Sequence, residues 1–149
     1  MDNIDRKILA TIQTSFPLTQ RPYRDLGDQL QCSEEEILER VKKLKKDGII
    51  RRIGGNFNSQ SLGFTTTLCA AKVPDDKIKA FVEFVNRYPG VTHNYTRDHQ
   101  YNIWFTLLVP NGQDIPKYIE QIILNTGIGD IINLPAVRIF KIVVDFALR

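Results

Sequence analysis

The sequence predicts an α+β protein in which an N-terminal winged helix-turn-helix is followed by a ferredoxin-like βαββαβ domain. Two observations lead to this prediction. Apolar residues recur at helical spacing through the first 48 positions, and after residue 64 strand-like runs alternate with two amphipathic helical ones. With 149 residues, the chain has room for two small domains. We therefore expect a helix-turn-helix domain at residues 1–60 and a ferredoxin-like ligand-binding and dimerisation domain at residues 61–149.

Three short helices are expected in the N-terminal domain. The first has an N-cap at Asp2 or Asn3 and stops before Pro17. Its apolar positions follow helical spacing and are Ile4, Ile8, Leu9 and Ile12. The second helix starts at Pro22, which suits a first helical position, and runs to Leu30.

The third helix is the one that would read DNA in a helix-turn-helix. Ser33 and Glu36 have the spacing of a capping box at its start, and Gly48 ends it. Residues 49–53 and 56–58 are expected to form the two strands of the wing, joined by a turn of two glycines. A winged helix-turn-helix results.

Five elements are expected in the second domain, which are a strand (65–73), a helix (76–88), a hairpin (91–109), a helix (114–125) and a final strand (137–146). This order places both helices on one face of a four-stranded antiparallel sheet. The other face must meet water, a partner or a ligand. Because both sides of the final strand are apolar, we expect the second face to be buried as well, most simply by another subunit.

Charge and cysteine content narrow the function classes. The net charge is +3, with 11 basic against 9 acidic residues up to position 60 and 9 against 8 afterwards, so neither half has a strong basic excess. Cys32 and Cys69 have no metal-binding spacing, and free thiols in a reducing compartment are expected. Charged residues at the start exclude a secretory signal, and no apolar run approaches the ~20 residues of a membrane span. We expect a cytoplasmic protein.

The stretch 91–108 concentrates unusual chemistry, with both histidines, the single tryptophan, two tyrosines and an arginine. A strand, a two-residue turn and a returning strand would place Tyr95 opposite Asn102. The same register would place His93 opposite Trp104. One face of the sheet would then carry His93, Tyr95, Arg97, Asn102 and Trp104. A slip of one residue would undo this arrangement.

The N-terminal half resembles the Lrp/AsnC regulators. The segments MDNIDRKIL and SEEEILERVKKLKKDGIIRR, together with Leu62–Gly63, match that family's helix-turn-helix and hinge. The second half resembles the same family's effector-binding and oligomerisation domain. The resemblance makes a DNA-binding regulator the default function.

The charges argue against sequence-specific DNA binding. The third helix begins with Glu34 and Glu35, which would face the DNA phosphates. Its lysines lie at the other end, where they complement the helix dipole, and are Lys42, Lys43, Lys45 and Lys46. Arg51 and Arg52 could contact DNA phosphates, but two arginines alone would bind DNA weakly.

A more specific resemblance covers nearly the whole chain, through the segments DGIIRRIGG, YPGVTHNYTRDHQYNIWFTL and GIGDIINLPAVRIFKIVVDF. These segments resemble the sirohaem (siroheme) decarboxylase family, Lrp-like proteins of the alternative haem biosynthesis pathway. The resemblance implies a carboxy-lyase that removes CO2 from the C12 and C18 acetates of sirohaem, giving 12,18-didecarboxysirohaem. It also implies a heterodimer of two paralogous subunits, with sirohaem as substrate, haem binding as a further expectation and no added cofactor. The motif does not distinguish the two subunits.

The residue types fit such a ligand, which is a flat metallated macrocycle edged by carboxylates. Trp104, Tyr95 and Tyr101 offer aromatic surface, and Asn102 lies on the same predicted face. Cations that could pair with carboxylates are Arg97, Arg51, Arg52, Arg138 and Lys141. We expect Arg97 to hold a carboxylate that is retained, because a clamp on the departing one would stabilise the ground state.

Catalysis needs an acid that protonates the carbon left behind when CO2 departs. His93, His99 and Tyr95 are the candidate catalytic residues, and His93 or His99 could be the axial ligand of iron. Two other functions stay open at this point. One is a haem- or tetrapyrrole-sensing transcriptional regulator, and the other is a non-catalytic subunit that completes its partner's site.

Overall fold

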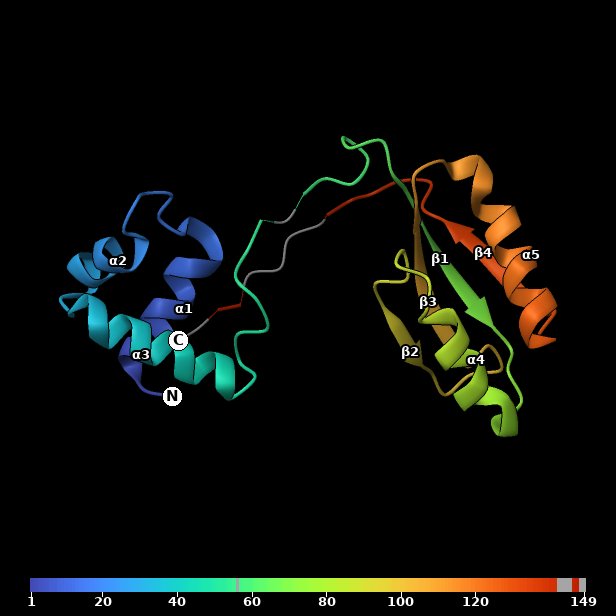
Figure 1. The fold of residues 1–149 in the computed structure, drawn as a ribbon, viewed down its shortest axis with the longest axis horizontal. Coiled ribbons are helices and arrows are strands. Elements are labelled where there is room, and N and C mark those ends of the chain that lie inside the picture. Colours follow the sequence, from blue (N-terminus) through green and yellow to red (C-terminus); the bar gives the residue numbers. More distant parts are fainter. Residues whose placement is uncertain (56, 142–145, 148–149) are drawn as a thin grey trace. The chain divides into compact units, whose positions relative to one another are not determined.

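The computed structural model describes residues 1–55, 57–141 and 146–147. The chain forms two compact units, Met1–Gly55 with Lys141–Arg149, and Asn56–Phe140 (Figure 1). We call them the helical unit and the sheet unit. The α+β class is confirmed. The boundary after Gly55 lies near the expected residue 60, whereas the described residues 141, 146 and 147 group with the helical unit instead of the sheet.

The helical unit contains the three expected helices, α1 (Asn3–Ser15), α2 (Pro22–Leu30) and α3 (Glu34–Lys46). Asp2 caps α1 in a reciprocal capping box with Asp5, with backbone–carboxylate distances of 2.9 and 3.0 Å. Ser33 accepts a hydrogen bond from the Glu36 backbone at 3.1 Å, but the Glu36 carboxylate turns to Arg40. Only half of the predicted capping box of α3 forms.

One apolar cluster joins the three helices, and its buried members are Ile8, Leu9, Leu26, Ile37, Val41, Leu44 and Ile50. Gly27 of α2 lies close to the backbone of the turn between α2 and α3. A Cβ there would lie 2.6 Å from the Cys32 carbonyl oxygen, so this position requires glycine. The apolar faces of the three helices therefore pack together into one compact unit.

The predicted wing is wrong for the described residues, because 49–55 and 57–58 contain no strand; residue 56 lies outside them. Ile50 is buried against the helices, and its backbone N–H bonds to the Leu44 carbonyl at 3.1 Å. Ile49 and Ile53 are exposed. A two-stranded hairpin without a third strand is marginal in water, and here only one isoleucine has a core to join.

The sheet unit follows the predicted βαββαβ order. Its elements are β1 (Thr65–Ala71), α4 (Ile78–Val85), β2 (Asn94–Thr96), β3 (Ile103–Val109), α5 (Ile115–Thr126) and β4 (Ile131–Pro135), with 3₁₀ turns η1 (Asp75–Lys77) and η2 (Gly112–Asp114) before the helices. The strands pair antiparallel in the order β2-β3-β1-β4.

Both helices pack on one face of this sheet (Figure 1). Alternate residues of β3 supply the centre of the core, where Phe105 meets Phe81 of α4 edge to face at 6.2 Å. Ile122 of α5 and Val85 of α4 are fully buried beside them. In the described ranges, no helix has the length and apolar character needed to cross a membrane.

The final strand lies earlier in the chain than predicted. β4 spans Ile131–Pro135, while residues 137–141 form no strand and 142–145 lie outside the described residues. A left-handed cap at Gly127 ends α5, and four residues later Ile131 pairs with Ala71 of β1. Beyond β4, Val137 and Phe140 are 100% and 83% exposed. The apolar residues at 137–141, which were expected to lie on both sides of the final strand, therefore do not belong to the sheet.

Candidate functional site

The central hairpin forms with a different register from the predicted one. Tyr95 pairs with Trp104, and the Arg97 backbone N–H bonds to the Asn102 carbonyl at 2.8 Å. A four-residue loop, 98–101, therefore replaces the predicted two-residue turn. Because the shift is by two residues, each side chain stays on its predicted face even though the predicted partners are wrong.

Three side chains of the predicted site form a line along the outer face of the β2 segment. The His93 and Tyr95 rings lie 6.0 Å apart, and the Arg97 guanidinium lies 5.2 Å from the centre of the Tyr95 ring. All three residues are exposed. An imidazole, a phenol and a guanidinium thus follow one another on the face that the helices leave uncovered.

An apolar floor continues this line across the sheet. Trp104 lies between Tyr95 and Ala70, and the next row places Thr106 beside Leu68. The exposed side chains of Leu68 and Leu134 face each other across β1 and β4. Sequence reasoning missed Leu68 and Leu134; alternation along β1 could have found Leu68, but β4 had been placed elsewhere.

Two threonine hydroxyls support His93. Thr106 Oγ1 accepts the His93 backbone N–H at 3.1 Å and lies 2.8 Å from Thr92 Oγ1, which in turn lies 2.9 Å from His93 Nδ1. A hydroxyl can donate to or accept from this ring nitrogen. The Thr92 hydroxyl therefore accommodates either tautomer of His93 as well as the imidazolium.

His99 has a different environment in the 98–101 loop. Its Nδ1 accepts the Tyr101 backbone N–H at 3.2 Å, and its ring stacks on that of Tyr101 at 6.2 Å and 23°. The hydrogen bond assigns the proton of the neutral ring to Nε2. His99 therefore presents an N–H donor, whereas an axial ligand must present a nitrogen lone pair.

Tyr101 is held at both ends. Its carbonyl accepts the Trp104 indole N–H at 2.7 Å, and its hydroxyl donates to Asp130 Oδ1 at 2.8 Å. The hydrogen bond to Asp130 raises the pKa of Tyr101 above its usual value, with smaller contributions from burial and from the Asp130 charge. Asp130 was not predicted as a site residue, because it contacts the hairpin only through the fold.

The side chain of Asn102 is hydrogen-bonded to the backbone of Val73. Its Oδ1 accepts the Val73 N–H at 2.9 Å, and its Nδ2 donates to the Val73 carbonyl at 2.8 Å. These two bonds fasten the start of β3 to the chain that leaves β1. The arrangement favours a structural role for Asn102 rather than contact with a substrate.

The remaining predicted cations belong to other parts of the chain than the hairpin. Arg51, Arg52 and Lys141 belong to the helical unit, and all three are exposed. Arg138 follows β4, and its guanidinium lies 4.9 Å from the centre of the Phe140 ring. Of the predicted cations, only Arg97 lies on the open sheet face.

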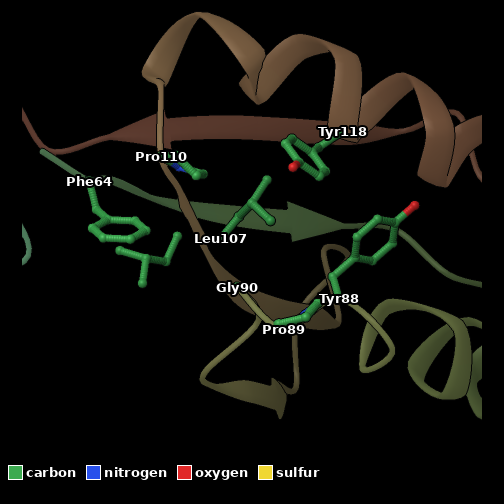
Figure 2. Close-up of a pocket in the computed structure, with 8 residues that line it drawn as sticks. Phe64, Tyr88, Pro89, Gly90, Leu107, Pro110 and Tyr118 are labelled. Atoms are coloured by element: carbon green, nitrogen blue, oxygen red, sulfur yellow. The ribbon is translucent and has the colours of Figure 1, made fainter.

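A cavity of about 270 Å³ lies elsewhere in the sheet unit, and Figure 2 shows its lining. Tyr88 and Tyr118 meet there edge to face at 5.9 Å, and the other lining residues are Phe64, Pro89, Gly90, Leu107, Leu108 and Pro110. Burial, with Tyr118 beside it, raises the pKa of Tyr88. No predicted site residue lines this apolar cavity, and it offers no histidine or cation. We therefore place the candidate site on the hairpin.

The described part of the chain contains no group of three or more His, Cys, Asp or Glu side chains that could hold a metal ion. A single histidine could still ligate a metal that arrives within a ligand. The open face thus combines a flat aromatic and apolar floor, one guanidinium and His93, and His99 lies in the adjoining 98–101 loop. It suits a flat anionic molecule more than a small polar one.

This architecture defines a two-domain protein of the Lrp/AsnC type. Residues 61–141 match the AsnC-like ligand binding domain, and residues 5–51 match the Siroheme decarboxylase NirDL-like HTH domain. The structure of an AsnC family transcriptional regulator from Agrobacterium tumefaciens shares the fold, with a TM-score of 0.80 at 23% identity, covering 99% of this chain and 97% of that one.

A relative with higher sequence identity shows which family within the Lrp/AsnC type the chain belongs to. The siroheme decarboxylase alpha subunit of Desulfovibrio desulfuricans is 56% identical over 146 residues, covering 98% of this chain and 84% of that protein. The chain therefore belongs to the sirohaem decarboxylase family. The crystal structure of the siroheme decarboxylase NirDL in complex with an iron-uroporphyrin III analogue is also similar, at 33% identity and a TM-score of 0.69. This match covers 95% of our chain but 48% of the NirDL chain, so our chain spans about half of that protein.

Proposed function

We propose that this chain is the alpha-type subunit of a sirohaem decarboxylase, a carboxy-lyase that converts sirohaem to 12,18-didecarboxysirohaem in alternative haem biosynthesis. The observation that carries the proposal is the line of His93, Tyr95 and Arg97 beside the apolar floor of the sheet, in a chain of this family. Sirohaem would be the substrate, with no added cofactor.

The open face suits the parts of a carboxylated macrocycle. Tyr95 and Trp104, opposite each other on β2 and β3, supply adjoining aromatic surface for the ring. Arg97 supplies a planar cation that can hold a carboxylate with two hydrogen bonds. We assign Arg97 to a carboxylate that is retained, because pairing with the departing group would stabilise the ground state.

Each decarboxylation breaks the bond between the acetate CH2 and its carboxylate carbon. CO2 leaves, the electron pair stays on the CH2 carbon and spreads into the conjugated macrocycle, and one proton converts this carbon to a methyl group. We assign the proton to His93, because the Thr92 hydroxyl can accept from Nδ1–H of the imidazolium. Tyr95, whose ring lies beside His93, is the second candidate donor.

His99 would bind rather than react. Because its Nδ1 accepts the Tyr101 N–H, the neutral ring offers Nε2–H to a substrate carboxylate. The same hydrogen bond disfavours His99 as the axial ligand of the sirohaem iron. Should the iron take a ligand from this hairpin, His93 is the histidine whose Nε2 can present a lone pair.

The partner would be the paralogous subunit, and the enzyme would be cytoplasmic. The name alpha subunit in the Desulfovibrio relative supports a second subunit, and NirDL is a chain about twice as long as ours. The uncovered sheet face and the exposed Leu68 and Leu134 support a site completed by that subunit.

The test is anaerobic incubation with sirohaem, alone and with the paralogous subunit, followed by mass analysis of the tetrapyrrole. Loss of two carboxyl groups in the mixture is the expected result. An unchanged mass in both incubations would reject the proposal. Full activity of the paralogue in a third incubation, without our chain, would show instead that our chain is a non-catalytic subunit.

The other candidate function is a tetrapyrrole-sensing regulator, which the intact α1–α3 unit keeps open. Against it, the acidic start of α3 stands where a recognition helix meets DNA, and Arg21 is already paired with Glu34. Binding to its own promoter DNA in gel-shift assays, dependent on sequence and strengthened at low salt, would favour the regulator.

A further inference from the structure

We propose that Asp130 is a positioning residue of the hairpin site, which fixes His99 and Trp104 by holding the Tyr101 hydroxyl. This inference rests on the proposed decarboxylase function for its kinetic consequences, but its structural consequences are independent of that function. Asp130 lies immediately before β4, far from the hairpin in sequence, and reaches the 98–101 loop only in the folded sheet unit.

Asp130 is itself anchored to the sheet. Its carbonyl accepts the Lys72 backbone N–H at 2.9 Å, and the next residue, Ile131, pairs with Ala71 of β1. The carboxylate therefore projects from a backbone that the β1–β4 ladder holds. The 2.8 Å bond from Tyr101 ties a surface loop to this framework.

Tyr101 passes this restraint on to two site residues through its backbone. Its N–H sets the tautomer of His99, and its carbonyl holds the indole N–H of Trp104. The stacking of the His99 ring on Tyr101 adds a second contact. If the Tyr101 side chain lost its bond to Asp130, the His99 ring and the Trp104 indole would both be less firmly positioned.

The loop needs such a restraint because its other fastening lies at its base. The Arg97–Asn102 backbone bond and the two bonds between Asn102 and Val73 hold the point where the loop closes. Asp130 instead holds the part of the loop that carries His99. The raised pKa of Tyr101 keeps its hydroxyl protonated, and so able to donate, through neutral and mildly alkaline pH.

The experiment compares Asp130→Ala, Asp130→Asn and Tyr101→Phe in the full chain, with Asp76→Ala as an exposed-carboxylate control. Trp104 is the only tryptophan, so steady-state fluorescence anisotropy reports its mobility without any substrate. Asp130→Ala and Tyr101→Phe should lower the anisotropy and give similar emission spectra. Asp130→Asn, which keeps an acceptor oxygen, should restore most of it. Nitrogen-15 spectra should show His99 losing its single Nε2–H tautomer in Asp130→Ala and Tyr101→Phe.

With sirohaem and the paralogous subunit, Asp130→Ala should lower kcat about tenfold with little change in KM, since misplacement of positioned groups mainly affects the reacting geometry. The Asp130→Ala/Tyr101→Phe double variant should be no worse than either single variant. Unchanged Trp104 anisotropy and His99 tautomer in both single variants, or additive losses in the double variant, would overturn the proposal. If Asp130→Ala fails to fold, Tyr101→Phe and Asp130→Asn decide by the same readouts. Inactive wild-type protein would reject the decarboxylase function, while the spectra would still decide the role of Asp130.

Discussion

The helical unit and the sheet unit use their charged and polar side chains in opposite ways. In the helical unit these groups pair with each other, as in Arg40 with Asp2, Asp5 and Glu36, and Lys43 with Asp47. In the hairpin of the sheet unit, hydroxyl and backbone groups hold the histidines and the tryptophan, and Arg97 remains exposed. Charges that satisfy each other stabilise a fold, whereas charges oriented by neutral groups stay available to a ligand.

The largest effect should come from His93, if the hairpin groups act on the substrate. His93→Ala should lower decarboxylation turnover by about 10²-fold or more, because a positioned acid contributes that much. Thr96→Ala, in the adjoining strand β2 but on the opposite face of the sheet, is the control and should be near wild type. A changed iron spectrum of the sirohaem complex would instead make His93 an axial ligand. Wild-type turnover and spectrum together would remove His93 from the site.

Arg97→Ala should weaken sirohaem binding by about 10- to 150-fold, as expected for loss of a charge-assisted contact of about 1.5–3 kcal/mol. Arg97→Lys should recover part of the loss, because lysine keeps the charge but not the planar fork. Titration of the sirohaem absorption spectrum measures both. Arg87→Ala is the matched control, since Arg87 lies over Phe84 beside α4. Normal binding with slow turnover would contradict the anchoring role.

Arg40→Leu tests the other side of the comparison. It leaves the Asp2, Asp5 and Glu36 carboxylates without their shared cation and should lower the free energy of unfolding of the helical unit by about 1–2 kcal/mol. Lys43→Ala, which breaks a single exposed pair, should have a much smaller effect. Chemical denaturation followed by residue-resolved NMR measures both. A drop in turnover of folded Arg40→Leu protein would mean that the helical unit also serves the site.

The two units should also respond to pH in opposite directions. The Asp5 backbone and Arg40 hold the pKa of Asp2 below its usual value, about 3.9, so this stabilisation is present above that pH and is lost as pH falls through the lowered pKa. The pKa of Tyr101 is raised, so its contribution is present below about pH 10 and is lost as pH rises through the raised pKa.

Amide exchange and chemical shifts followed over pH would separate the two responses. Acid should loosen the start of α1 first, and alkali should loosen the 98–101 loop first. This is the smallest expected effect, because both groups lie at the surface. Simultaneous loosening of both regions at either extreme would show that the pH response does not follow the pairing of each unit.

Local patterns predicted the helical unit well. The N-caps at Asp2 and Ser33 and the stop at Gly48 act on a few neighbouring residues, so the sequence contains the signals they need. The prediction of the wing was wrong. The glycines and isoleucines of this segment are compatible with a hairpin, but a hairpin needs a third strand to be stable, and the helical unit supplies none in its described residues.

Alternation predicted which hairpin residues share a face, but it could not predict the loop. A two-residue turn and the observed four-residue loop place each hairpin side chain on the same face of the sheet but give it a different cross-strand partner. Only the four-residue loop places Tyr95 beside Trp104. The final strand was misplaced for a related reason. Both 131–135 and 137–146 have strand character in the sequence, and pairing with β1 selects the first.

The sequence by itself determined the α+β class, the βαββαβ order, the family and the residue types gathered in 91–108. Periodicity, caps and motifs involve residues that are close in sequence or follow a fixed order along the chain, so they can be recognised without knowledge of three-dimensional contacts. The tertiary structure alone decided the hairpin register, the place of β4 and the bond between Asp130 and Tyr101. These depend on which distant backbone groups meet, and strand pairing settles that only when the chain is folded.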